Sequence, residues 1–184
     1  VPVLTEYKTL GSTAAVKELI NRVAGVLGGT LLFVTGIAMI AAPLITMLFA
    51  PGFVGQAEKF YLTTEMTRIT FPYLFLISMT GFCGAILNSF GRFAVPAFTP
   101  FFLNLSLIFA ALIAAPWFAE PVFALAWGVL LAGVVQLLFQ LPSLYRLDLV
   151  PRPIWDTSDK GVRRILKLMV PAMFGVSVSQ INLL

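Results

Sequence analysis

The chain has 184 residues, of which 59% are hydrophobic and only 11% are charged, and its formal net charge is +4. A soluble domain carries charge on about a quarter of its residues, so this composition excludes an ordinary water-soluble globular fold. Histidine is absent and Cys83 is the only cysteine, which excludes an internal disulfide, a cysteine–histidine metal cluster and a Ser/His or Cys/His catalytic triad. The 8 carboxylates lie outside the apolar runs. We therefore predict no catalytic acid pair, no metal site and no enzymatic activity.

Apolar segments recur along the chain at lengths near the roughly 20 residues that a helix needs to cross the hydrocarbon layer. These runs predict four complete transmembrane helices, at residues 23–49, 69–90, 94–118 and 122–141. A fifth apolar run, residues 170–184, is too short to cross and is interpreted as the start of a further helix in a longer protein. The predicted fold class is an all-α polytopic membrane protein.

Proline and glycine mark the expected helix boundaries. Pro72 is predicted to lie in the first turn of the second helix, where its missing N–H is tolerated, and Pro142 to end the fourth. Gly91 and Arg92 form the expected tight turn between the second and third helices. Pro96 and Pro100 follow at the start of the third.

Basic residues are distributed unevenly between the two sides of this map. The N-terminal segment, the turn after the second helix and the link after the fourth contain ten of the 12 Lys and Arg residues, whereas the opposite side has only Lys59 and Arg68. Cytoplasmic loops retain Lys and Arg. The N-terminus of this chain is therefore predicted to be cytoplasmic.

Several uncharged polar side chains fall inside the apolar runs and are candidates for lining a substrate cavity. They are Asn104 on the third helix, Gln136 on the fourth, and Ser177, Ser179 and Gln180 on the fifth. An intramembrane amide either bridges helices or faces a water-filled path. Bridging is the favoured interpretation for Asn104 and Gln136. For the cluster on the fifth helix, bridging and a cavity wall are equally favoured.

The link between the fourth and fifth helices, residues 143–169, is predicted to be cytoplasmic and ends in an amphipathic helix over residues 156–169. The simpler interpretation is an interfacial anchor that obeys the distribution of positive charge. The alternative is an electrostatic attraction for anionic lipid or a pyrophosphate headgroup. The candidate residues for this attraction are Arg92, Arg163, Arg164 and Lys167.

Small residues recur at four-residue spacing, as in Gly84 with Asn88 and in Ala124, Gly128 and Ala132. In lipid, small side chains let helix backbones approach closely. Packing within the chain is favoured over a dimer interface, because every multi-span protein needs such contacts.

Longer motifs add a family resemblance. They include RITFPYLFLIS at residues 68–78, GAILNSFGRFAVPAFTP at residues 84–100 and PAMFGVSVSQI at residues 171–181. With these motifs the chain resembles, over essentially its whole length, the MurJ (MviN) family of lipid II flippases in the multidrug/oligosaccharidyl-lipid/polysaccharide exporter superfamily.

The resemblance implies a 14-helix protein with two lobes, to which residues 1–184 contribute part of the N-terminal lobe: the third to sixth helices and the start of the seventh. It implies transport of lipid II, the undecaprenyl-pyrophosphate-linked peptidoglycan precursor, across the bacterial inner membrane by alternating access. The expected partners are lipid II, membrane lipids and the remaining helices of the full-length protein, with no cofactor and no nucleic acid. The family's main cationic substrate residues fall outside this chain.

Two alternatives remain open at the level of sequence. One is an exporter of another lipid-linked polysaccharide within the same superfamily. The other is a membrane scaffold subunit without transport activity, for which the packing glycines would matter and the polar residues would not.

Overall fold

The computed structural model describes residues 4, 6–7 and 12–181, and every regular element in these residues is helical. In the last helix, the side chains of residues 170 and 172–181 are outside this description. The chain divides into two compact units. Unit 1 contains the residues up to Leu27 and those from Pro151 onward, and unit 2 runs from Gly28 to Val150.

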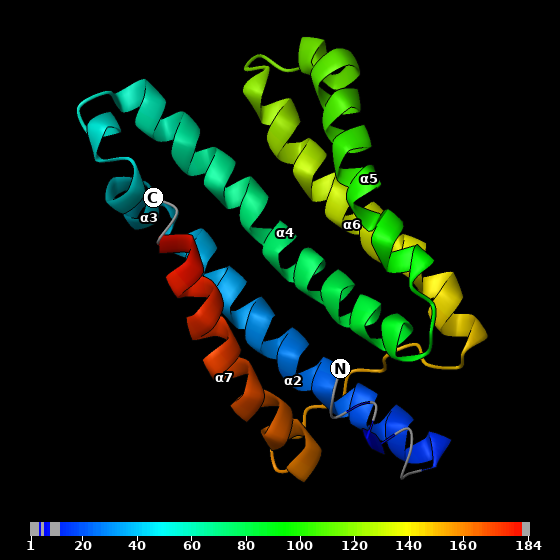
Figure 1. Ribbon diagram of the computed structural model, residues 1–184. Coiled ribbons are helices and arrows are strands. Elements are labelled where there is room, and N and C mark those ends of the chain that lie inside the picture. The colour runs from blue at the N-terminus through cyan, green and yellow to red at the C-terminus, as the bar shows by residue number, and fades with distance from the viewer. Residues whose placement is uncertain (1–3, 5, 8–11, 182–184) are drawn as a thin grey trace. The chain divides into compact units, whose positions relative to one another are not determined.

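The helices are arranged along the chain as α2 (Thr13–Ile40), α3 (Ala42–Phe49), α4 (Ala57–Ser89), α5 (Ala94–Phe109), α6 (Val122–Arg146) and α7 (Lys160–Ile181), as Figure 1 shows. A 3₁₀ turn, Pro51–Phe53, precedes α4, and α5 continues as a π segment, Ala110–Ala114, and a 3₁₀ turn, Ala115–Trp117.

Four helical stretches are long and apolar enough to cross a bilayer, namely Thr13–Ile40, Ala57–Ser89, Ala94–Trp117 and Val122–Arg146. The all-α fold class and its four long apolar helices are therefore confirmed for the described residues.

Unit 2 is built around α6, which packs against both α4 and α5. Glycines on α6 allow this close approach. A Cβ atom added to Gly128 would lie 2.6 Å from the Cβ of Ala110, and one added to Gly133 would lie 2.8 Å from Cδ2 of Tyr73. Ala124 and Ala132 are fully buried on the same helix. These contacts favour the interpretation of the small residues as intrachain packing positions.

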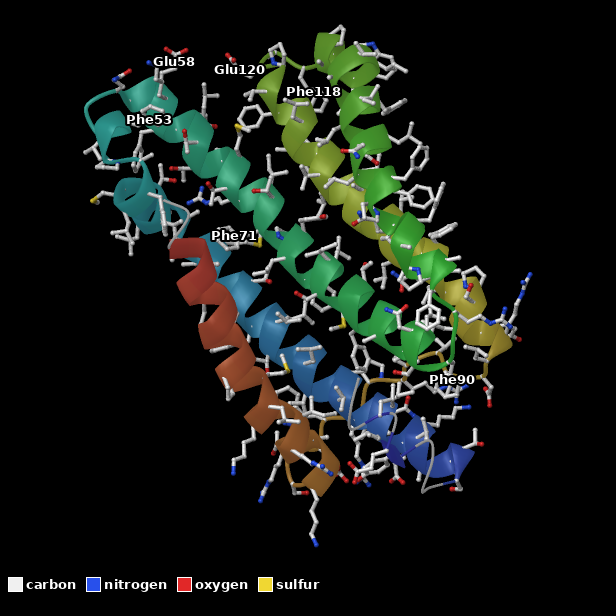
Figure 2. All side chains as sticks on the ribbon, in the orientation of Figure 1. Phe53, Glu58, Phe71, Phe90, Phe118 and Glu120 are labelled. Atoms are coloured by element: carbon white, nitrogen blue, oxygen red, sulfur yellow. The ribbon has the colours of Figure 1, made fainter. Side chains whose placement is uncertain are left out.

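The long helices of unit 2 alternate in direction. Figure 2 shows Phe53 and Glu58 at one end of the unit, together with Phe118 and Glu120 from the α5–α6 connection, whereas Phe90 lies at the opposite end. This alternation is what successive membrane spans require.

The start of α4 differs from the sequence prediction. The second helix was expected over residues 69–90 with Pro72 in its first turn, but α4 begins at Ala57 and Pro72 lies inside it. The prediction was wrong because an apolar run marks the hydrocarbon thickness, while helical hydrogen bonding continues into the polar segment. The hydroxyls of Thr67 and Thr70 donate to backbone carbonyls four residues earlier, at 2.7 and 2.8 Å, and so are compatible with a helix.

The end of α6 also differs, because Pro142 lies inside the helix and α6 continues to Arg146. A proline removes a single N–H, and membrane helices tolerate that loss. The helix ends instead where Asp148 adopts a left-handed conformation with φ of 54°. There the N–H of Leu149 donates to the carbonyl of Leu144 at 3.0 Å.

The amphipathic segment and the last apolar run form one helix. They were predicted at residues 156–169 and 170–184 as separate parts, but α7 is continuous from Lys160 to Ile181 and includes Pro171. The last residues of that predicted run, 182–184, lie outside the described part of the chain.

The first predicted span is interrupted. Residues 23–49 were expected to form one helix, but α2 already begins at Thr13 and ends at Ile40, and α3 begins at Ala42. Pro43 causes this break, because it lacks the N–H that would bond to the carbonyl of Met39 four residues earlier. Nε of Arg68 donates to that carbonyl instead, at 3.4 Å.

The tight turn predicted at Gly91 and Arg92 is confirmed. Gly91 has φ of 74°, a left-handed conformation that glycine adopts without strain. The N–H groups of Gly91 and Arg92 donate to the carbonyls of Asn88 and Leu87, at 3.1 and 2.9 Å. These bonds give hydrogen-bond donors to the last carbonyl groups of α4 before α5 begins at Ala94.

Candidate functional site

A buried polar cluster connects the three long helices of unit 2. Gln136 and Gln140 lie one turn apart on the same face of α6, with 2% and 1% of their surface exposed. Nε2 of Gln136 donates to the carbonyl of Thr99 at 3.1 Å, and Nε2 of Gln140 donates to the hydroxyl of Thr99 at 3.3 Å. Both amides thus hold α6 against the same residue of α5.

The third helix enters this cluster through Tyr73 on α4. Its hydroxyl donates to Oε1 of Gln136 at 3.5 Å. The hydroxyl of Thr99 in turn donates to the carbonyl of Val95 at 3.3 Å. Each side chain in this chain of hydrogen bonds is uncharged, which suits a low-dielectric environment where an unpaired charge would be costly.

One atom of the cluster has no hydrogen-bond partner among the described residues, namely Oε1 of Gln140. It lies beside Gly84 of α4, where an added Cβ would be 3.7 Å from this oxygen and 3.3 Å from Cβ of Pro96. The missing side chain of Gly84 therefore lets α4 approach Pro96 of α5 closely beside this amide.

Asn104 is not part of this cluster. It lies on α5 five residues beyond Thr99, and five residues rotate a helix by about 140° relative to the starting direction. Accordingly Thr99 is buried, whereas Asn104 is exposed and forms no hydrogen bond with the described residues. Asn104 and Gln136 were grouped as cavity candidates, but the structure separates them. Gln136 is buried between the packed helices, whereas Asn104 lies on an exposed face of α5.

The other cavity candidates lie on the second half of α7. Ser177, Ser179 and Gln180 belong to this helix by their backbone, but their side chains lie outside the described residues. Their role as a cavity wall remains a prediction.

The cationic candidates fall in both units. Arg92 is exposed in the α4–α5 turn of unit 2. Arg163, Arg164 and Lys167 are exposed on the first half of α7 in unit 1. Arg163 donates through Nε to the carbonyl of Thr157 at 3.1 Å.

Arg164 also has a partner, because it pairs with Glu6 at 2.9 Å. Among the described residues, Arg92 and Lys167 form no ion pair. Arg163 bonds to a carbonyl and likewise forms no ion pair with the described residues, so three of the four cationic candidates lack a compensating carboxylate there.

Asp156 is a charged residue on the linker between α6 and α7. Asp156 accepts hydrogen bonds from the hydroxyl and the backbone N–H of Ser158, at 2.6 and 2.9 Å. These bonds, with a smaller contribution from Arg22, hold the pKa of Asp156 below its ordinary value. The carboxylate therefore stays charged at every physiological pH.

Sequence reasoning did not anticipate Tyr73 and Thr99 as members of the buried cluster. Their types carry little signal, since a tyrosine or threonine within an apolar run is common. The four-residue spacing of Gln136 and Gln140 indicates a shared face, and a search for donors and acceptors on neighbouring spans is the additional step that finds Thr99.

Across the described residues, no group of three or more His, Cys, Asp or Glu side chains is placed to hold a metal ion. The long apolar helices, the uncharged polar groups buried between them and the cations at helix ends define a polytopic α-helical membrane protein.

Similarity to known proteins identifies the family within this class. A family model described as "Lipid II flippase MurJ" matches residues 1–184. The "Probable lipid II flippase MurJ" of Haemophilus influenzae is 44% identical over 191 residues, which cover 100% of this chain and 38% of that protein. The corresponding protein of Vibrio cholerae is 46% identical over 191 residues, covering 100% of this chain and 36% of its own length.

The "Lipid II flippase MurJ" of Burkholderia cenocepacia is 39% identical over 188 residues, covering 100% of this chain and 36% of that protein. The chain thus spans 36 to 38% of the length of these relatives. It belongs to the MurJ family of lipid II flippases.

Proposed function

We propose that this chain is a section of a lipid II flippase and contributes four membrane-spanning helices and the start of a fifth to one of two lobes. The observation that carries this proposal is that the family match covers the same residues, 1–184, that contain the four long apolar helices. In this account the lobes move against each other so that a central cavity opens to each side of the membrane in turn.

We propose that these helices cross the bacterial inner membrane with the N-terminal end of α2 in the cytoplasm. The distribution of basic residues supports this orientation. The α4–α5 turn, which contains Arg92, and the linker after α6 both follow an even number of spans after that end. They therefore share its side. The N-terminal segment, this turn and the stretch from Arg146 to Lys167 together contain ten of the 12 Lys and Arg residues.

We propose that Ser177, Ser179 and Gln180 on α7 form a polar wall of the substrate cavity. The concentration of hydrogen-bonding groups on one membrane helix supports this role. Asn104 remains a second candidate because its side chain is exposed. The buried hydrogen bonds of Gln136 instead favour a role in holding α5, α6 and α4 together.

We propose that Arg92, Arg163, Arg164 and Lys167 attract anionic headgroups to the cytoplasmic surface. Support comes from their exposure and from the absence of an ion pair at Arg92 and Lys167 among the described residues. Guanidinium and ammonium groups bind phosphate oxygens strongly.

A chimaera tests the proposed function directly. The corresponding section of the Haemophilus influenzae relative is replaced by this chain, and the product is expressed in cells depleted of their own lipid II flippase. We expect growth to be restored and the lipid II headgroup to become accessible from outside. A chimaera that reaches the membrane in normal amounts but restores neither would contradict the proposal, and export of a different lipid-linked glycan would support the alternative exporter.

The same chimaera separates the cavity from the packing residues. Gln180→Leu should lower flipping without lowering the amount of folded protein. Gln136→Leu is the matched control, because it should lower stability first. Equal flipping rates per folded molecule for Gln180→Leu and the unsubstituted chimaera would remove Gln180 from the substrate path.

A further inference from the structure

In unit 1, the part of the linker formed by residues 151–159 lies directly on α2. Asn21 holds it through two hydrogen bonds, since its side-chain Oδ1 accepts from the N–H of Arg152 at 2.7 Å and its carbonyl accepts from the N–H of Ile154 at 2.9 Å. Gly25 makes room for it, because an added Cβ would lie 2.1 Å from the carbonyl oxygen of Ile154.

Charge adds a second attachment at Arg22, one residue after Asn21. The guanidinium of Arg22 forms ion pairs with Asp159, through Nη1 and Oδ2, and with Asp156, through Nε and Oδ2 at 3.4 Å. It also pairs with Glu18 on its own helix, at 2.5 Å. Between 20 and 27% of the side-chain surface of Arg22, Asp156 and Asp159 is exposed, so water can reach all three groups.

Both aspartates divide their two oxygens in the same way. Oδ1 of Asp159 accepts from the N–H groups of Gly161 and Val162, at 2.8 and 3.0 Å, and thereby caps the first turn of α7. Oδ1 of Asp156 accepts from Ser158. In each residue only Oδ2 reaches Arg22, so the bonds within the linker do not depend on the contact with α2.

Every charged group in this contact therefore has a partner that it retains when the contact opens. Arg22 keeps Glu18, Asp159 keeps the α7 N-terminus, and Asp156 keeps Ser158. Opening does not leave an unpaired charge, which is the usual reason why breaking an ion pair is costly.

We propose that Arg22 with Asp156 and Asp159 is a reversible ionic contact that attaches the start of α7 to α2 and can open while the cap of α7 stays intact. Glu18 binds Nη2 of Arg22 while Asp159 binds Nη1 and Asp156 binds Nε, so Glu18 keeps the guanidinium paired in both the closed and the open form. The inference concerns unit 1 alone and does not depend on which substrate the protein transports.

Hydrogen–deuterium exchange in the intact membrane protein, reconstituted in nanodiscs, measures this opening at the amides of residues 151–157, which include the two N–H groups that bond to Asn21. Arg22→Gln should raise their exchange rate by about fivefold, as expected when a partly exposed ion pair is lost. Asp159→Asn should act similarly, because asparagine still caps a helix but has no charge. The double variant should exchange no faster than the faster single variant, since both substitutions remove the same contact.

The amides of Gly161 and Val162 give the decisive result, because Oδ1 of Asp159 holds them in both the closed and the open form. Their exchange should stay unchanged in Arg22→Gln, whereas a merely structural charge cluster would loosen them together with residues 151–157. Arg68→Gln, which removes a cation from an ion pair in unit 2, is the control and should leave these amides unchanged. Equal acceleration at Gly161 and Val162 in Arg22→Gln, no change in Arg22→Gln at residues 151–157, or fully additive effects in the double variant would each overturn the proposal.

Discussion

The contacts inside unit 1 and those inside unit 2 differ in their chemistry. In unit 2, α4, α5 and α6 meet through glycines and through uncharged amides such as Gln136 and Gln140. In unit 1, apolar side chains of α2 and α7 also meet, but ion pairs of Arg22 and hydrogen bonds of Asn21 are added where the linker lies on α2. The difference follows from the surroundings, because charges are costly inside hydrocarbon and inexpensive at a wet helix end.

Contacts of these two kinds differ in how readily they can rearrange. Close packing without charge has few alternative arrangements, since interiors are dense and respond sharply to changes in volume. A contact between partly exposed charges that each keep a second partner can rearrange at a lower cost, because no charge is left unpaired. We therefore expect unit 2 to behave as a rigid body and the linker of unit 1 to open and close.

The largest effect should come from filling a packing glycine. Gly133→Leu places side-chain atoms where Tyr73 and Leu76 lie, within 2.8 and 2.9 Å of an added Cβ. Overpacking of this kind costs about 1–3 kcal/mol, and we expect the upper part of that range because two helices must shift. Thermal unfolding in detergent measures the loss.

The matched control is Gly81→Ala on α4, where an added Cβ meets no atom within 4 Å. This variant should be as stable as the parent or slightly more so, because alanine favours a helix. A similar loss of stability in both variants would show that any glycine replacement is harmful. It would contradict the claim that close packing at Gly133 causes the loss.

The next largest effect concerns the buried amides. Gln136→Leu removes the donor to the carbonyl of Thr99 and the acceptor for Tyr73, and should destabilise the folded protein by about 1 kcal/mol, as is usual for interhelical hydrogen bonds in membranes. Asn104→Leu should have almost no effect, because Asn104 is exposed and forms no hydrogen bond with the described residues. Chemical unfolding of the two variants side by side makes the measurement, and equal losses would contradict the assigned geometry.

A smaller effect is expected at the break between α2 and α3. Arg68→Gln removes the donor to the carbonyl of Met39, which Pro43 leaves without its helical partner, and also removes the ion pair with Glu65. A partly exposed pair contributes about 0.5 kcal/mol. Restoring the helical N–H with Pro43→Ala should make Arg68→Gln less harmful. The melting temperatures of the single and double variants reveal this coupling, and its absence would disprove the link.

The smallest effect is a pH dependence of the linker in unit 1. The folded-state pKa of Asp156 is lowered, so its contribution to stability is complete above the ordinary aspartate value of about 3.9 and is lost as the pH falls through the lowered value. Protection factors at residues 151–159, which compare the exchange rate with that of an unfolded chain at the same pH, should therefore fall in strong acid. Asp156→Asn should reduce this fall, and an unchanged pH profile of the protection factors would contradict the role of its charge.

Much of the fold could be predicted because hydrocarbon imposes a length and a polarity on each span. The runs at residues 94–118 and 122–141 correspond closely to α5 with its continuation and to α6. The ends of helices were less predictable. Pro72 and Pro142 lie inside helices because a single missing N–H is outweighed by all the other helical hydrogen bonds of a long span.

The candidate site was less accessible to sequence reasoning. Intramembrane amides were found at Asn104 and Gln136, but their opposite surroundings depend on how far α5 is rotated against α6, which no pattern in one chain reports. The ion pair between Arg22 and Asp159 joins residues 137 positions apart. Such a contact follows from packing and not from local periodicity.

The central claim is that four helices cross the membrane and leave the basic turns in the cytoplasm. Single cysteines at Arg92, Arg163 and Glu120, introduced after Cys83→Ser, test it in intact cells with a reagent that cannot cross the inner membrane. Glu120→Cys should be labelled from outside, and the other two should be labelled only after the membrane is permeabilised. Labelling of Arg92→Cys or Arg163→Cys in intact cells would contradict this topology.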